Sequence, residues 1–211
     1  MGKFAMVLLG GIVALALVAG ACGVSTYNNL VGLQQGVDAG WAQVENVYQR
    51  RSDLIPNLVA TVRGAAGFEQ ATLTAVTEAR ASVGRVQLSG KELVNNPQAF
   101  AQWQAAQEGL GSALQRLLVV AENYPDIKAT GAFRDLQAQL EGTENRISVE
   151  RMRFNEAAQA YNTARLRFPA NIIANISGFG EKAYFKASAG ADKPPQVQFN
   201  FGGGQSPAPA H

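Results

Sequence analysis

The 211-residue sequence contains one cysteine and one histidine, and both limit the chemistry open to it. Because Cys22 stands alone, no disulfide can form within the chain and a zinc site built from several cysteines is excluded. The single histidine is His211. The rest of the chain therefore has no imidazole for acid–base catalysis, for Ser-His or Cys-His nucleophile pairs, or for binding a metal.

An excess of charge of either sign is also lacking. The chain has 18 basic and 16 acidic residues, for a formal net charge of +2, so we expect no nucleic-acid partner. At this length, with 47% hydrophobic residues, one domain with appendages is expected. We expect no cofactor.

Charge is absent altogether from residues 4–24, a run of apolar and small residues. It just reaches the ~20 residues that a helix needs to cross a bilayer, and core helices seldom run so long without one charge. We interpret residues 1–24 as an uncleaved signal-anchor helix. Two alternatives stay open: a lipoprotein signal ending in Ala19-Gly-Ala-Cys22, with lipid on Cys22, and plain cleavage after a small residue such as Ala21.

Basic residues suggest the orientation of this segment. Lys3 precedes it, and the next basic residue is Arg50. The positive-inside bias then predicts a single-pass protein of the cell membrane, with its N-terminus in the cytoplasm and most of the chain on the extracytoplasmic side. Membrane lipid is the first expected partner.

Apolar residues at three- and four-residue steps predict four helical stretches after the anchor. The first extends from the anchor to about Arg51, and the second to about Arg85. Residues 88–96 are expected to form a loop, and Asn96-Pro97 is a typical helix start. The third helix ends before residues 123–126, and the fourth becomes regular near Ala132. We predict an all-α fold: an antiparallel bundle of about four long helices over residues 25–168, with the transmembrane helix before it.

The fourth stretch has the most regular pattern in the chain. Its large apolar residues recur every seven positions, at Phe133, Leu140, Ile147, Phe154, Tyr161 and Phe168. A sustained seven-residue repeat predicts supercoiled packing against another helix. At ~1.5 Å per residue, residues 132–167 would be ~54 Å long, which matches the first two stretches together and favours antiparallel pairing.

A cluster of polar residues, Arg-Arg-Ser-Asp at positions 50–53, interrupts the apolar pattern of the first two stretches, and Pro56 follows it. Proline offers no amide to Ser52 and disfavours helical geometry at Ile55. The helix could end near Arg51 and restart with Ser52 or Asp53 as its N-cap, or it could continue with a kink.

The middle of the fourth stretch is also polar, and we expect its charged residues to pair with those of the 50–53 cluster. An unpaired buried charge costs several kcal/mol, so we predict a hinge and charge network made of Arg50, Arg51, Asp53, Pro56, Glu144 and Glu150. The alternative is a solvated charged face, which would contribute little. A metal site is disfavoured, because the glutamates lack the Glu-x-x-His companions of helical di-metal sites.

The pattern changes in the tail, residues 169–201. A short amphipathic helical segment comes first, and residues 183–187 and 196–201 then resemble strands. Two short strands are marginal alone, so they would pair with each other or dock on a neighbouring copy. The predicted self-association residues are Tyr184, Phe185, Val197, Phe199 and Phe201. Residues 202–211 are expected to be disordered.

Several of these motifs together resemble the pattern of the bacterial LemA family. They are Tyr27-Asn28, Trp41, the Arg-Arg-Ser-Asp-Leu-Ile-Pro-Asn-Leu-Val run of residues 50–59, Asn123-Tyr-Pro125, Glu141-x-x-Glu-Asn145 and Phe168-Pro169. The resemblance extends from the anchor to Tyr184-Phe185. It implies a membrane-attached antiparallel helical bundle of bacterial origin, with no established enzymatic activity.

We therefore expect a non-enzymatic, membrane-anchored helical scaffold that self-associates into a homo-oligomer at the bacterial membrane surface. The alternative is an envelope sensor or adaptor that binds a separate signalling protein or protease. A hydrolase using Glu141, Glu144 or Glu150 is the least favoured hypothesis, because a site without histidine or cysteine needs strongly shifted carboxylates.

Overall fold

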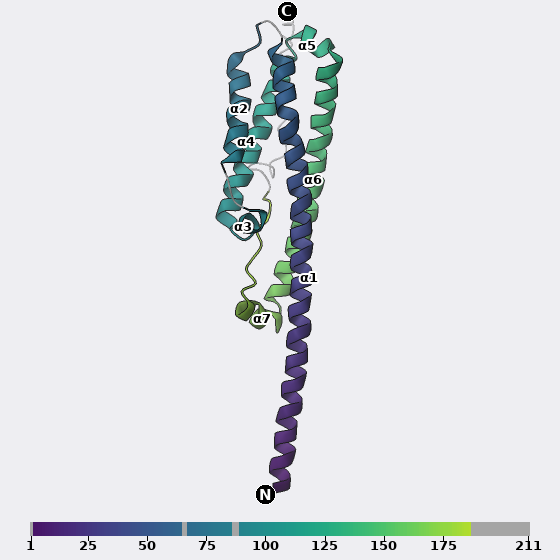
Figure 1. Cartoon of the computed structure of the whole chain (residues 1–211), viewed down its shortest axis with the longest axis vertical. Coiled ribbons are helices and arrows are strands. Elements are labelled where there is room, and N and C mark those ends of the chain that lie inside the picture. Colours follow the sequence, from purple (N-terminus) through teal and green to yellow (C-terminus); the bar gives the residue numbers. More distant parts are fainter. Residues whose placement is uncertain (1, 65–66, 86–88, 187–211) are drawn as a thin grey trace, which may run out of the picture.

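A computed structural model of the chain describes residues 2–64, 67–85 and 89–186, and every regular element in these ranges is helical. Helix α1 (Gly2–Arg63) runs the whole length of the molecule (Figure 1). Its second half lies among the other long helices, which are α2 (Gln70–Gly84), α4 (Pro97–Ala121) and α6 (Gly131–Leu166). The short helices are α3 (Gly90–Val94), α5 (Pro125–Ala129) and α7 (Ala170–Ser177). The all-α prediction is confirmed; we call the part from residue 25 onward the head.

Helix α1 continues without a break through Pro56. Of the two alternatives, an end and restart at residues 51–53 is therefore wrong, and the helix continues past Pro56. Ile55 and Leu58 on either side of the proline are buried, so packing stabilises the helix where one backbone hydrogen bond is lost. The chain turns later, between Arg63 and Gln70, where Gly67 has a φ of 81° that suits glycine.

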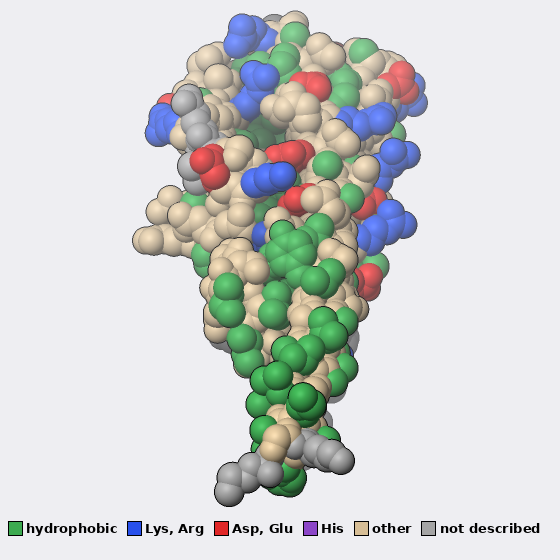
Figure 2. Space-filling view, turned by 60° about the horizontal axis from the view of Figure 1, so that its bottom comes forward, with side chains coloured by type: hydrophobic (Ala, Val, Ile, Leu, Met, Phe, Trp, Pro, Cys, Tyr) green, Lys and Arg blue, Asp and Glu red, His purple; other side chains and the backbone are tan. Residues whose placement is uncertain are grey.

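The first part of α1 extends away from the head (Figure 1). Its large side chains from Phe4 to Val24 are exposed, and α1 is the one helix among the described residues long and apolar enough to cross a membrane. Figure 2 shows hydrophobic side chains covering the narrow end of the molecule, whereas charged side chains gather on the wide end. An N-terminal membrane-spanning helix, as predicted for residues 1–24, is consistent with this shape.

Helix α6 runs back along the second half of α1, and α2 packs against α4 (Figure 1). The seven-residue repeat of α6 is confirmed for five side chains, which are all buried: Phe133, Leu140, Ile147, Phe154 and Tyr161. The sixth, Phe168, lies beyond the end of the helix and is 81% exposed. The two helices lie close together at Gly40, where an added Cβ would lie 3.6 Å from the Phe154 Cα, an ordinary van der Waals contact.

Residues 90–94 form helix α3, where the sequence predicts a loop. The sequence does contain a helix-start signature here, a serine followed three residues later by a glutamate. In the structure Ser89 and Glu92 form a capping box, in which each side chain accepts a hydrogen bond from the other residue's backbone amide. These bonds from Ser89 lower the pKa of the exposed Glu92 carboxyl. The start of α4 is confirmed, since Asn96 accepts hydrogen bonds from the amides of Gln98 and Ala99.

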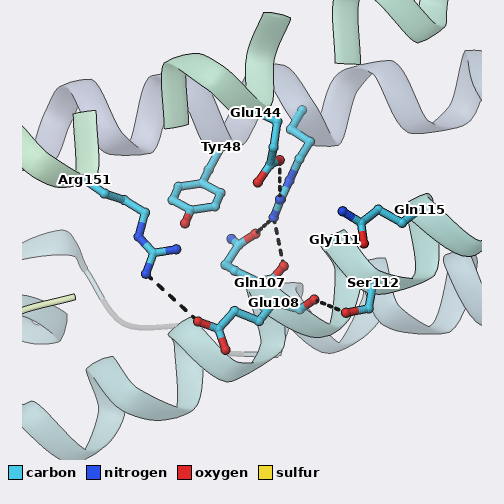
Figure 3. A pocket seen from close by; sticks show the side chains of 9 residues that line it. Tyr48, Gln107, Glu108, Gly111, Ser112, Gln115, Glu144 and Arg151 are labelled. Carbon is cyan, nitrogen blue, oxygen red and sulfur yellow. Dashed lines mark hydrogen bonds and ion pairs between the residues drawn. The ribbon is translucent and has the colours of Figure 1, made fainter. Parts of the chain in front are cut away.

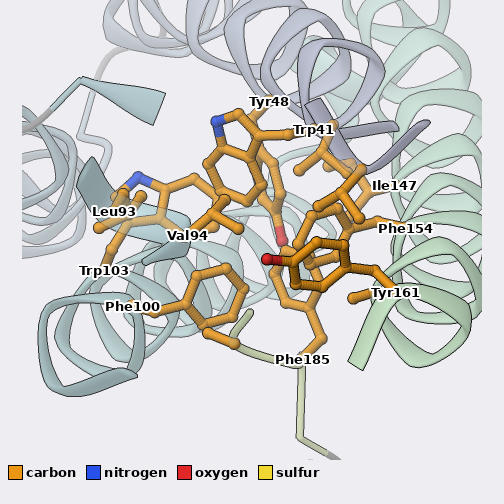
Figure 4. Close-up of a cluster of buried hydrophobic side chains, with 14 residues drawn as sticks. Trp41, Tyr48, Leu93, Val94, Phe100, Trp103, Ile147, Phe154, Tyr161 and Phe185 are labelled. Atoms are coloured by element: carbon orange, nitrogen blue, oxygen red, sulfur yellow. The ribbon is translucent and has the colours of Figure 1, made fainter. Parts of the chain in front are cut away.

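Two groups of buried side chains fill the head. The aromatic cluster is nearer the anchor and takes Val37, Trp41, Val44, Tyr48, Leu93, Val94, Phe100, Trp103, Ile147, Phe154, Ala158, Tyr161, Ala183 and Phe185 (Figure 4). The aliphatic cluster lies beyond it and takes Ile55, Leu58, Val62, Leu73, Val76, Leu110, Leu114, Leu117, Ala121, Ile127, Phe133 and Leu140. Each of α1, α4 and α6 supplies residues to both clusters.

The extended segment after α7 is held by side-chain amides. Asn162 and Asn155 each exchange two hydrogen bonds with the backbone, at Lys182 and Phe185 respectively, at 2.8–3.0 Å. Gln104 does the same at Lys186. These amides satisfy the backbone groups that strand pairing would otherwise satisfy, and the structure assigns no strand to residues 181–186. The second predicted strand, residues 196–201, lies outside the described residues.

Candidate functional site: a buried arginine joining three helices

A polar layer separates the two core clusters. On α1 the buried positions Tyr48 and Ile55 are interrupted by Arg51, and on α4 Trp103 and Leu110 are interrupted by Gln107. On α6 the polar pair Thr143 and Glu144 follows Leu140 and precedes Ile147. The helical spacing of three and four residues brings these interruptions to the same level of the head.

Arg51 makes the contacts that join the layer. Its side chain is only 4% exposed, and its Nη1 donates to the Glu144 Oε2 at 3.1 Å. Its Nη2 donates to the Gln107 Oε1 at 2.6 Å and to the Gln107 carbonyl oxygen at 3.1 Å. The guanidinium carbon also lies 5.0 Å from the centre of the Tyr48 ring. One side chain of α1 thus links α4 and α6.

The electrostatics of this contact are asymmetric. The guanidinium is buried, whereas the Glu144 side chain is 56% exposed. A half-exposed carboxylate interacts through a solvent-screened field and contributes little by charge alone. The neutral oxygens of Gln107 are buried with Arg51, and hydrogen bonds to a charged donor in such surroundings are stronger than neutral ones. We therefore attribute most of the compensation for the buried charge to Gln107.

The predicted network is only partly assembled here. Arg51 and Glu144 are brought together, while Arg50 is exposed on the outer face of α1. Asp53 accepts a local hydrogen bond from Gln49 at 2.7 Å, and Glu150 pairs with Arg153 on its own helix at 2.8 Å. These two contacts join neighbours within one helix, so they do not link helices.

Gln107 is the residue that the sequence interpretation missed. It continues the three- and four-residue spacing of a buried stripe on α4, which consists of Phe100, Trp103, Gln107, Leu110, Leu114, Leu117 and Ala121; Gln104 is buried beside this stripe. An amide in such a series needs a buried partner. Arg51 is likewise a polar residue within the buried apolar stripe of α1. This shared position is the sequence signal that pairs Arg51 with Gln107.

A cavity of about 210 Å³ opens beside the polar layer (Figure 3). Its lining is Tyr48, Arg51, Gln107, Glu108, Gly111, Ser112, Gln115, Glu144 and Arg151. Arg151 closes one side: its Nη2 lies 4.0 Å from the Glu108 Oε1 and donates to the Lys186 carbonyl at 3.1 Å. The two arginines and two glutamates of the lining balance in formal charge.

The chemistry of this lining is limited. Burial raises the pKa of the Tyr48 phenol above its ordinary value of 10.0, against the opposing effect of Arg151 and Arg51, so the phenol stays protonated at neutral pH. Arginine does not titrate in this range. Among the residues that the structure describes, no three His, Cys, Asp or Glu side chains gather in a way that could hold a metal ion. The arrangement suits a structural contact that fixes the register of three helices.

Other predicted residues lie elsewhere. Cys22 is exposed on α1, in the segment that extends from the head. Phe185 is buried in the aromatic cluster, with its ring centre 4.9 Å from that of Phe100 and 5.6 Å from that of Phe154 (Figure 4). Its ring therefore serves the core of its own chain, which corrects its assignment as a contact for a neighbouring copy. Tyr184 is half-buried, and Val197, Phe199 and Phe201 lie outside the described residues.

Comparison with known proteins agrees with the motifs and the helical fold. Magnetosome protein MamQ of Magnetospirillum gryphiswaldense is 27% identical over 93% of this chain and 79% of the relative. Magnetosome protein MamQ 2 of Paramagnetospirillum magneticum is 27% identical over 80% of this chain and 67% of the relative. Residues 40–199 match the model of the LemA family, a range that includes the polar layer, the aliphatic cluster and all of the aromatic cluster except Val37. The chain therefore belongs to the LemA family.

Proposed function

We propose that this protein is a non-enzymatic scaffold, anchored in the bacterial cell membrane by one pass, that associates with copies of itself at the membrane surface. The head would be an antiparallel bundle on the extracytoplasmic side, built from the α1–α6 and α2–α4 pairs. The observation that carries the proposal is the continuity of α1 over Gly2–Arg63. Because one helix is both the apolar span and the central helix of the head, it would hold the head of every copy at a fixed height above the membrane.

Self-association follows from that geometry and from apolar surface. Copies that stand in the same orientation present matching faces, which favours symmetric contacts. Val149 and Met152, three residues apart on α6, are both exposed on the head. The alternating Val197, Phe199 and Phe201 of the tail add a second apolar element.

Native mass spectrometry of the detergent-extracted full-length chain tests this function. We expect masses at multiples of 22.3 kDa, and fewer copies after truncation behind Lys186, which keeps Phe185 in the core. A truncated chain that assembles like its parent would assign the contact to the head. A full-length chain of 22.3 kDa at every concentration would refute the scaffold.

A groove in the head favours the second candidate, an adaptor for a separate envelope protein. Its volume is about 740 Å³, and it lies among α1, α2 and α4 beside Gln49, Thr77, Arg80 and Trp103. Mixed polar and aromatic lining of this kind suits a protruding partner side chain. A photo-crosslinker at Thr77 that captures one heterologous protein in preference to a second copy would support the adaptor over the scaffold.

A further inference from the structure

The strongest unexplained surface is apolar and lies at the base of the head. Leu166 and Phe168 at the end of α6, and Ile172 and Ile176 on α7, are 69%, 81%, 48% and 79% exposed. We call these four side chains the basal patch. Among the described residues of the head, Phe168 is the most exposed aromatic side chain. Ile172 and Ile176 are four residues apart and share one face of α7, and exposed apolar side chains on one face indicate a contact surface.

Helix α7 is fixed in place by its other face. Ala174 is buried, and a Cβ at Gly23 of α1 would lie 3.8 Å from the Ile173 Cδ1. The Phe179 ring lies 5.5 Å from the Tyr27 ring of α1, and the Arg165 Nε donates to the Phe179 carbonyl at 2.8 Å. Helix α7 therefore packs beside α1 at the lower end of the head (Figure 1), and Ile172 and Ile176 remain outside this contact.

The level of this contact matches the end of a membrane span. The apolar run of residues 4–24 is ~32 Å long at ~1.5 Å per residue, close to the ~30 Å hydrocarbon thickness of a bilayer. Ile173 lies beside Gly23, next to the end of that run. Tyr27 follows within one turn, in the interfacial position that tyrosine favours.

The charges near the patch fit the same partner. The chain has no acidic residue between Glu156 and Glu181. Within this range Arg165 and Arg167 flank Leu166, and Arg167 lines a shallow cavity of about 240 Å³ with Ser25, Thr26 and Asn29 of α1. Basic residues next to exposed apolar side chains are typical of segments that lie in a phospholipid interface.

We propose that α7 and the basal patch lie in the headgroup region of the same bilayer that α1 crosses. The apolar side chains would enter the boundary of the acyl chains, while Arg167 meets lipid phosphate. The inference rests on the proposed membrane anchor. A second contact beside the span would prevent the head from tilting, because one helix alone fixes depth better than angle.

The test uses the full-length chain in phosphatidylcholine–phosphatidylglycerol vesicles, with Cys22→Ser as background so that one introduced cysteine carries a fluorophore. The label goes on Ile176→Cys. The matched control is Val119→Cys, which is exposed near the far end of α4. Lipids with a spin label near the headgroup quench fluorophores in the interface. We expect quenching at position 176 and none at position 119.

A second variant separates lipid contact from folding. With the label on Phe168→Cys, the pair Ile172→Asn and Ile176→Asn should abolish the quenching, while Val119→Asn should preserve it. All three substituted positions are exposed, so the emission of the core tryptophans should stay unchanged.

Three results would overturn the inference, and they differ from one another. Release of the chain by alkaline carbonate would refute the anchor itself and the inference with it. A chain that resists carbonate but shows equal quenching at positions 176 and 119 would refute only the lipid contact. The third result is blue-shifted emission at position 176 that the spin-labelled lipid does not quench. If this shift disappears on dilution into excess vesicles, the patch contacts a second copy rather than lipid.

Discussion

The contact between Arg51 and Gln107 can be tested by replacing either side chain or both. In Arg51→Met, the Gln107 oxygen is left buried without its donor; in Gln107→Leu, the guanidinium loses its 2.6 Å acceptor. In the double variant both polar partners are gone and two apolar side chains of similar size meet. The structure predicts that the double variant is more stable than the sum of the single losses implies.

The magnitudes follow from burial. An unsatisfied buried acceptor costs about 1–3 kcal/mol, and a hydrogen bond to a charged group contributes about 1.5–3 kcal/mol. Glu144 adds at most about 1 kcal/mol, because its side chain is 56% exposed. Each single variant should therefore lose about 2–3 kcal/mol of unfolding free energy, and the coupling between them should be about 2 kcal/mol.

The assay is urea unfolding of the full-length chain in detergent micelles. The two tryptophans of the chain, Trp41 and Trp103, are both in the aromatic cluster, so their emission reports the head rather than the span. The control cycle uses the surface pair of Arg153 and Glu150, with Arg153→Met and Glu150→Gln, and should couple by less than about 0.5 kcal/mol. Equal, near-zero coupling in both cycles would refute the assignment of Gln107 as the main partner of Arg51.

Three further predictions concern the core. Gly90→Ala should destabilise the head, because its Cβ would clash with the Trp41 indole and with Glu45; tryptophan-detected unfolding measures the loss, and an unchanged midpoint would refute the packing. Phe185→Ala should cost about 3–5 kcal/mol as a buried aromatic truncation, whereas a surface role in self-association would leave stability intact. The pKa of Tyr48 is raised in the folded chain, so its contribution to the free energy of unfolding is present below pH 10.0 and is lost as the pH rises further. Tyr48→Phe should therefore flatten the loss of stability at alkaline pH. An identical alkaline profile in both proteins would contradict the burial of Tyr48.

Periodicity was enough to predict the long helices, since their buried residues follow the three- and four-residue steps of α1, α4 and α6. The position of the first break was not predictable in the same way. Pro56 is a strong local signal, but buried Ile55, Leu58 and Val62 around it outweigh the lost hydrogen bond. Tertiary packing therefore outweighs the helix-breaking tendency of proline here. The chain turns instead at glycines 64 and 67.

The site was half predictable for a related reason. Arg51 and Glu144 were expected to meet because both are charged, and charge is conspicuous in a sequence. Gln107 carries no charge, so its partnership depends on knowing which face of α4 is buried. The strand-like residues 183–186 show the converse limit: a pattern typical of strands also suits an extended segment whose backbone is bound by asparagine and glutamine side chains.

The central claim is that copies of this anchored chain associate within a membrane, and energy transfer in vesicles tests it most directly. Donor and acceptor dyes on Val119→Cys, in the Cys22→Ser background, would be co-reconstituted and then diluted by fusion with empty vesicles. The scaffold predicts transfer that persists as the surface density falls. Transfer that declines to the level of randomly placed monomers would contradict it.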